Sequence, residues 1–230
     1  MLFFIYLKSF LLYTYCRVVY VKKNRGFTLT ELLAVLVVLG LVGLLIFPTI
    51  EKTIKDAKND LYDSQVKNII DAAKSWVADN PRYLPKNSGE VLTLSLCQLK
   101  IDSYVEKDIT NPKTDKLFPC ASKINISKDG EKYIYTIDFS NLDEELKSND
   151  ISYPKVNLIG DVLEYIEIGD SYIEEGLEFM NSDDANSYIL EIENGGIDTS
   201  IAGNYIVSYN LTNRENDRLI TLYRTIIVTE

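Results

Sequence analysis

The sequence contains few residues that could carry out catalysis. Its 230 residues include no histidine, so neither a nucleophile–histidine pair nor a histidine-bearing metal site can form. The cysteines, Cys16, Cys97 and Cys120, are too far apart for a thiolate metal cluster or a CxxC redox pair. Asp183 and Asp184 lack the spacing of an EF-hand calcium loop. We therefore expect no enzymatic activity, no cofactor and no metal site.

Charge is distributed unevenly along the chain. Residues 1–26 carry five basic and no acidic side chains, whereas residues 151–230 carry four basic and 15 acidic ones. The whole chain has a formal net charge of −10. The C-terminal third is acidic enough to repel nucleic acid and anionic lipid head groups. We expect no nucleic-acid partner.

An apolar segment follows the basic N-terminal region. Residues 27–47 contain a single charged side chain, Glu31. As a helix these residues would span about 32 Å, close to the roughly 30 Å hydrocarbon core of a bilayer. Basic residues gather at 17–25, just before the segment, and the charges just after it are mixed. The positive-inside rule then predicts a single-pass protein whose N-terminus is cytoplasmic and whose C-terminal bulk is outside.

The residues at the start of this segment form a specific motif. Lys22-Lys23-Asn24-Arg25-Gly26 is followed by Phe27-Thr28-Leu29-Thr30-Glu31. This resembles the N-terminal signal of type IV pilins and pseudopilins, in which a basic leader ends in Gly and Glu is the fifth residue after it. The resemblance implies that a prepilin peptidase cuts after Gly26 and N-methylates Phe27. It also implies a helix kink at Pro48.

A second implication of the resemblance concerns Glu31. A carboxylate within a membrane helix costs about 2.5–3.5 kcal/mol at mid-membrane and usually has a partner. The resemblance supplies one, the free amine of Phe27 on a neighbouring pilin subunit, so Glu31 would govern assembly. The alternative interpretation is that Glu31 lies at the membrane interface and is hydrated. For the whole segment, the alternatives are a plain membrane anchor and an uncleaved signal sequence.

The leader, residues 1–26, is longer than this motif normally has. One interpretation is that residues 1–20 reflect a wrongly assigned start and that translation begins at Val21. The other is a true long leader. In both cases Cys16 is absent from the mature protein.

Residues 49–140 are predicted to form a pilin-like stem and head. Apolar residues at spacings of three and four continue the helix to about Asp79, where Asn80-Pro81 ends it. A second helix is expected over 88–106. Residues 124–127 and 133–139 around Asp129-Gly130 predict a β-hairpin.

Two cysteines remain after the leader is removed. Cys97 and Cys120 both lie on the exported side, where an even pair favours a disulfide. A disulfide between them would close a loop of 24 residues and stabilise the head by about 3 kcal/mol. Two free, buried thiols remain the alternative, because the sequence does not give their separation.

The composition changes after a polar stretch at 141–150, which we interpret as a linker. Residues 151–230 contain short apolar runs separated by turn residues, a pattern typical of a small β-sandwich. They resemble the bacterial immunoglobulin-like domain of surface proteins and of some pesticidal crystal proteins. The matching residues are Pro154 with Leu158 and Gly160, then 168–170 with Tyr172 and Gly176, 197–199, 203–209 and 224–228. Glu174 and Asn213 depart from the pattern, which has Asp at both positions.

The expected fold class is α+β, with a long N-terminal helix (27–48 as the membrane or filament-core part), a small antiparallel β head, and an all-β immunoglobulin-like sandwich. The expected function is a structural, minor subunit of a type IV pilus that displays the sandwich outside the cell. Its partners would be the prepilin peptidase, other pilin subunits, the membrane and a surface ligand. Two alternatives stay open: an adhesin delivered by a pilin-type anchor, and a pseudopilin of DNA uptake or secretion.

Overall fold

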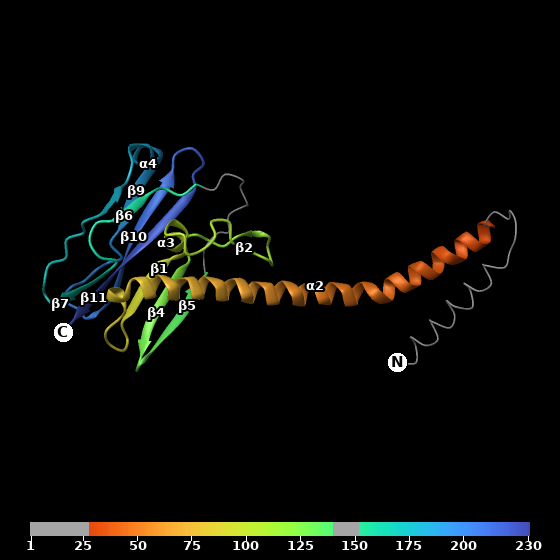
Figure 1. Ribbon diagram of the computed structural model, residues 1–230, viewed down its shortest axis with the longest axis horizontal. Coiled ribbons are helices and arrows are strands. Elements are labelled where there is room, and N and C mark those ends of the chain that lie inside the picture. The colour runs from red at the N-terminus through yellow and green to blue at the C-terminus, as the bar shows by residue number, and fades with distance from the viewer. Residues whose placement is uncertain (1–27, 140–151) are drawn as a thin grey trace. The chain divides into compact units, whose positions relative to one another are not determined.

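The computed structural model describes residues 28–139 and 152–230 (Figure 1). The chain forms two compact units, Met1–Ile54 and Lys55–Glu230. The predicted leader, residues 1–26, and the predicted linker, residues 141–150, lie outside the described residues. Within the second unit we call residues 55–79 the stem, residues 80–139 the head and residues 152–230 the C-terminal sandwich.

Helix α2 extends from Leu29 to Asp79, which confirms the predicted continuation of the apolar helix into an amphipathic one. Its last part buries Ile69, Ala73 and Trp76, residues spaced by four and three that share one face. The backbone N–H of Asn80 bonds to the Trp76 and Val77 carbonyls (3.0 and 3.1 Å), and the 3₁₀ turn η1 (Pro81–Tyr83) follows. Proline at its first position lacks an N–H and therefore suits a new start.

The first unit exposes its apolar side chains. From Leu29 to Ile54, large hydrophobic residues such as Leu44 and Phe47 are 43–84% exposed. Among the described residues, α2 is the one helix long and apolar enough to cross a membrane. So much exposed apolar surface is unfavourable in water, so lipid or other helices must cover this segment.

In the head, the predicted second helix over 88–106 is wrong. Residues 91–101 instead form strand β1 (Val91–Ser95) and the short helix α3 (Leu96–Ile101). Strand β1 pairs antiparallel with β4 (Lys123–Asp129), with Leu92 opposite Ile126. The change from strand to helix occurs at Ser95, whose hydroxyl accepts a hydrogen bond from the Gln98 N–H over 2.9 Å and so caps α3.

The predicted hairpin is confirmed. Strand β4 continues through Gly130, whose φ of +59° suits the tight turn, into β5 (Lys132–Asp138). The head sheet has the order β1-β4-β5, and a two-stranded ribbon of β2 (Thr110–Asn111) and β3 (Lys116–Leu117) lies in the connection before it. The head sheet thus has three strands, one more than the predicted hairpin. The additional strand is β1, which the sequence did not predict.

The C-terminal sandwich contains two sheets. One has the order β7-β11-β10-β9 and the other pairs β6 with β8. Their bounds are β6 Val156–Leu158, β7 Leu163–Glu167, β8 Leu177–Phe179, β9 Tyr188–Glu193, β10 Gly203–Asn213 and β11 Leu219–Thr229. The apolar runs at 156–159, 165–168, 188–192, 205–209 and 219–228 predicted five of these strands. They did not predict β8 or the six-residue helix α4 (Ser182–Ser187).

Strand β11 is buried on both faces and joins the sandwich to the head. One face carries Leu222, Ile226 and Val228 into the sandwich core. From the other face, Ile227 joins the head core, which also contains Leu163 of β7. The head and the sandwich therefore pack together within one compact unit. The class is α+β, as predicted, and the β-domain fits an immunoglobulin-like fold.

Candidate functional site

The predicted processing residues, Gly26 and Phe27, lie outside the described residues. The described chain starts at Thr28, directly after them. Their roles in cleavage and methylation therefore remain predictions.

Glu31 starts helix α2 together with Thr28. One oxygen of the Glu31 carboxylate, Oε2, accepts hydrogen bonds from the Thr28 N–H (3.0 Å) and hydroxyl (2.8 Å). In return, the Glu31 N–H donates to the Thr28 hydroxyl over 3.3 Å. This reciprocal pattern is a capping box, and it satisfies N–H groups that the first helical turn leaves unpaired. Glu31 therefore has a local role in addition to the predicted assembly role.

Pro48 lies inside α2. Proline has no N–H, so it removes one backbone bond of the helix, and its ring crowds the carbonyl four residues earlier. Just after it, the Thr53 hydroxyl donates to the Thr49 carbonyl over 2.9 Å. The kink expected at Pro48 stays a prediction.

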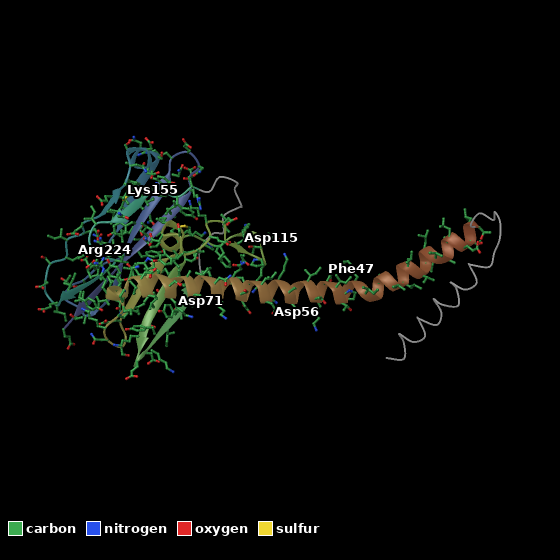
Figure 2. The ribbon with its side chains drawn as sticks, viewed as in Figure 1. Phe47, Asp56, Asp71, Asp115, Lys155 and Arg224 are labelled. Carbon is green, nitrogen blue, oxygen red and sulfur yellow. A yellow bond between two sulfur atoms is a disulfide. The ribbon has the colours of Figure 1, made fainter. Side chains whose placement is uncertain are left out.

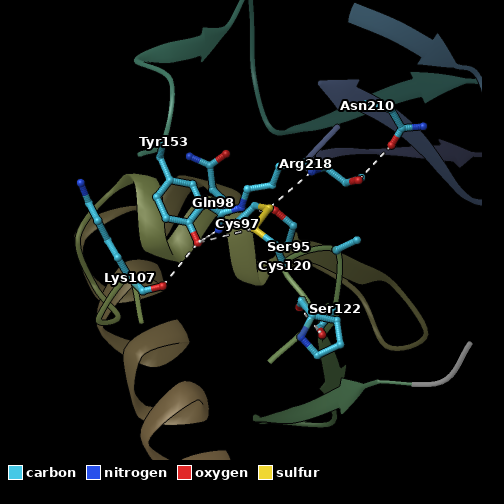
Figure 3. Close-up of a disulfide and its surroundings, with 12 residues drawn as sticks. Ser95, Cys97, Gln98, Lys107, Cys120, Ser122, Tyr153, Asn210 and Arg218 are labelled. Atoms are coloured by element: carbon cyan, nitrogen blue, oxygen red, sulfur yellow. Dashed lines mark hydrogen bonds between the residues drawn. A yellow bond between two sulfur atoms is a disulfide. The ribbon is translucent and has the colours of Figure 1, made fainter. Parts of the chain in front are cut away.

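Cys97 and Cys120 form a disulfide, with their Cα atoms 4.7 Å apart (Figure 3). Cys97 belongs to α3, and Cys120 lies in the segment that leads into β4. The Cys97 N–H also donates to the Cys120 carbonyl over 2.8 Å. The bond thus joins α3 to the start of the hairpin.

The disulfide also contacts the C-terminal sandwich, which the sequence did not predict. Cys97 Sγ accepts a hydrogen bond from the Thr221 N–H of β11 over 3.4 Å. Both cysteines belong to the core cluster of the sandwich and are 0% and 4% exposed. Tyr153 lies beside Cys120 and packs its ring against Arg218 (4.6 Å). Figure 3 shows Tyr153 and Arg218 around the two sulfur atoms.

A buried ion pair lies inside the sandwich. The Arg224 side chain is 0% exposed, and its Nη1 lies 2.9 Å from Glu174 Oε1 and 3.5 Å from Glu164 Oε1. Arg224 also bonds to the Ile159 carbonyl. Figure 2 labels Arg224 among the sandwich strands. A buried charge needs such partners to offset its desolvation.

Glu174 is the centre of this cluster. Its carboxylate accepts hydrogen bonds from the Tyr172 and Tyr209 hydroxyls and from the Gly176 N–H (2.7 Å). Burial opposes ionisation of Glu174, but these bonds and the Arg224 charge outweigh it and hold its pKa below the usual range. Burial and the Glu174 contact raise the pKa of both tyrosines. The cluster is therefore an ionised, structural network.

The sequence contained one signal for this network. Side chains alternate between the two faces of a strand, so residues 220, 222, 224, 226 and 228 of β11 share one face. All of them except Arg224 are apolar, which places Arg224 on the face toward the sandwich core.

The acidic pair Asp183-Asp184 lies in α4. The Asp184 carboxylate accepts from the Lys155 N–H (2.9 Å) and the Asn181 amide (2.7 Å), and Asn181 caps the helix. These bonds give the Asp184 side chain a local structural role. Among the described residues, no group of three or more Cys, Asp or Glu could hold a metal ion.

Comparison with known proteins identifies the N-terminal segment. Residues 21–47 match the family model of the prokaryotic N-terminal methylation motif. This match supports a type IV pilin-like or pseudopilin-like N-terminus, and such motifs are typical of structural proteins rather than enzymes. None of the curated proteins matches the chain.

Part of the chain is similar to a solved structure. It is the crystal structure of the lipoprotein BT2262 from Bacteroides thetaiotaomicron, at 22% sequence identity and a TM-score of 0.26. The similarity covers 34% of this chain and 38% of that protein.

Proposed function

We propose that the protein is a minor structural subunit of a type IV pilus or a related filament. A prepilin peptidase would cleave it after Gly26 and methylate Phe27. The methylation motif at residues 21–47 carries this proposal. Before assembly the precursor would span the membrane once, with its N-terminus in the cytoplasm.

The exposed apolar surface of α2 supports assembly with other subunits. After the precursor leaves the bilayer, the apolar side chains from Leu29 to Ile54 need another apolar environment. Helices of neighbouring subunits would supply it. Glu31 would then pair with the Phe27 amine of a neighbour, where its charge is neutralised away from water.

The C-terminal sandwich adds bulk to every subunit, which favours a minor subunit over the main repeating one. It would be displayed outside the cell as an immunoglobulin-like domain. The packing of β11 against the head supports a rigid display rather than a flexible one, because rotation would expose Ile227 and Leu163.

Protein recovered from native cells would test the proposal directly. We expect its intact mass and N-terminal sequence to show a methylated Phe27, and a Gly26→Val variant to remain uncleaved. Gly43→Val is the matched control, because it makes the same change far from the cleavage site and should be processed normally. An N-terminus at Met1 or Val21 in the wild-type protein would contradict the proposal and leave a static membrane anchor.

A surface-binding module delivered by the pilin part is the second candidate function. The observation that favours it is a polar cleft between the head and the sandwich, described below. Deleting residues 151–230 would not test it cleanly, since removal of β11 would open the head core. Point variants on the cleft are the better test.

A further inference from the structure

A polar cleft of about 490 Å³ lies between the head and the C-terminal sandwich. The ends of α2 and α3 form one wall, and β6 and β8 form the other. Its principal polar lining residues are Asn80, Gln98 and Asp102 of the head and Asn157 and Glu178 of the sandwich, with Trp76 beside them. The volume falls within the range of about 300–1,000 Å³ that is usual for small-ligand sites, which often lie between domains.

The head wall is held in place by its own hydrogen bonds. Asp102 Oδ2 accepts from the Trp76 indole N–H and from the Gln98 amide, both over 2.8 Å. The Asn80 amide donates to the Trp76 carbonyl over 2.9 Å. A ligand would therefore meet side chains that are already ordered, and binding would cost little side-chain entropy.

The same bonds leave hydrogen-bond acceptors on the lining residues. They use one of the two N–H groups of each amide, Asn80 and Gln98, and one of the two Asp102 oxygens, and they leave the carbonyl oxygens of both amides unused. On the other wall, Asn157 uses one of its two amide N–H groups toward Met180 Sδ (3.0 Å), and Glu178 is exposed. Amide and carboxylate oxygens accept hydrogen bonds, so the complementary ligand is rich in donors.

Charge and ring contacts narrow the class of ligand. Arg82 also lines the cleft, and its Nη2 lies 3.6 Å from Asp161. Because acidic and basic side chains face the same space, a strongly charged ligand of either sign meets a like charge and gains little. Trp76 and Tyr83 are stacked with their ring centroids 5.8 Å apart and give the wall an aromatic backing. A second cavity of about 310 Å³ shares Arg82 and Tyr83 and extends the cleft. A ligand that is donor-rich, neutral and elongated fits the description of a short carbohydrate.

We propose that this cleft binds a neutral oligosaccharide through its hydroxyl groups. Asp102 and Glu178 accept from sugar hydroxyls, while the amides of Asn80, Gln98 and Asn157 accept further ones. The proposal rests on the second candidate function, a surface-binding module. It does not depend on filament assembly, so the isolated subunit can test it while the N-terminal mass tests the pilin role.

The chain offers an intrinsic probe, because Trp76 is its single tryptophan and lines the cleft. We would titrate the full mature chain with cellobiose and with diacetylchitobiose and follow tryptophan emission. The detergent should be dodecyl dimethylamine oxide, since the sugar head groups of maltosides would compete. The variants are Asn157→Ala and Glu178→Gln, which lie across the cleft and leave the Trp76 hydrogen bond intact. Asn68→Ala, on the exposed face of the stem, is the matched control.

We expect a saturable change in emission with at least one disaccharide. Both cleft variants should weaken binding by about tenfold, the usual effect of losing one charged or well-placed hydrogen bond, and Asn68→Ala should not change it. Circular dichroism would verify that each variant is folded. No response to either sugar overturns the proposal, and so does a response that both cleft variants leave unchanged. A response to spermidine without one to sugars also overturns it, because the cleft would then be a cation site.

Discussion

The backbone N–H of Thr93 donates a hydrogen bond to the hydroxyl of Thr225 over 2.9 Å. Thr93 lies on β1 of the head and Thr225 on β11 of the sandwich, 132 residues later. Both residues are buried, at 2% and 0% exposure. Strand β1 is at the edge of its sheet, so this N–H has no strand partner on that side. The sandwich therefore supplies the acceptor for a buried N–H at the edge of the head sheet.

This relationship predicts that Thr225→Val destabilises the head. Valine has nearly the same shape but cannot accept the hydrogen bond, so the Thr93 N–H would be buried without a partner. The expected loss in the free energy of unfolding is about 1–3 kcal/mol. Urea titration followed by Trp76 emission measures it, and Trp76 lies in the stem rather than in the mutated sandwich.

The control for this variant is Thr136→Val, which makes the same change at an exposed position of β5. It should leave the Trp76 transition within about 0.5 kcal/mol of the parent protein. If Thr225→Val shifted only the far-ultraviolet circular dichroism and not the Trp76 transition, the head and the sandwich would unfold independently, contrary to the shared packing.

The disulfide gives a second stability prediction. Replacing both Cys97 and Cys120 with serine should lower the free energy of unfolding by about 3 kcal/mol, because the closed loop restricts the unfolded chain. Dithiothreitol should destabilise the wild-type chain by a similar amount and leave the double variant unchanged. Equal sensitivity of both proteins to the reductant would show that the thiols are not bonded in the native protein.

The Arg224 cluster predicts a larger effect. Arg224→Met would leave Glu174 buried beside two tyrosines without its cation, and loss of one partner of a buried pair costs about 3–5 kcal/mol. Arg214→Met removes an exposed charge from the same domain and should change stability by less than about 0.5 kcal/mol. Thermal unfolding of the two variants compares them. Equal midpoints would mean that the ion pair contributes nothing to stability.

Acidification should weaken the same cluster. Because the fold holds the pKa of Glu174 below its usual value, ionised Glu174 stabilises the native state above that value. This stabilisation is lost as the pH falls below about 4.5 and through the lowered pKa. Burial raises the pKa of the neighbouring Glu164, so its protonated form stabilises the native state at low pH. That stabilisation is lost as the pH rises. Glu174→Gln should flatten the acid side of the stability profile, and an unchanged acid slope would contradict the assignment.

The sequence predicted elements with a long or regular pattern and missed those set by tertiary contacts. Helix α2 follows from its apolar content and spacing, and the β4–β5 hairpin from alternation around Asp129-Gly130. Strand β1 was missed because the sequence prediction places Leu94, Leu96 and Leu99 on the buried face of one helix over 88–106. Pairing with β4 and burial against β11 decide in favour of a strand there.

The site residues divide in the same way. The methylation motif is local, so the sequence alone indicated it, and residues 21–47 match the corresponding family model. The contact of Cys97 with Thr221 joins residues 124 positions apart, and no local pattern indicates it. The cleft between head and sandwich likewise exists only because β11 packs on the head.

Glu31 allows the assembly role to be separated from the helix-capping role. Gln at this position keeps the capping box with Thr28 but removes the charge, whereas Ala removes both. If the charge pairs with the Phe27 amine of a neighbour, Glu31→Gln and Glu31→Ala should both abolish filaments in the sheared cell-surface fraction, although both precursors are still cleaved after Gly26. Glu51→Gln, on the same helix beyond the apolar segment, should assemble normally. Filaments from Glu31→Gln but not from Glu31→Ala would assign Glu31 to capping, because the hydrogen bonds and not the charge would then be what assembly requires.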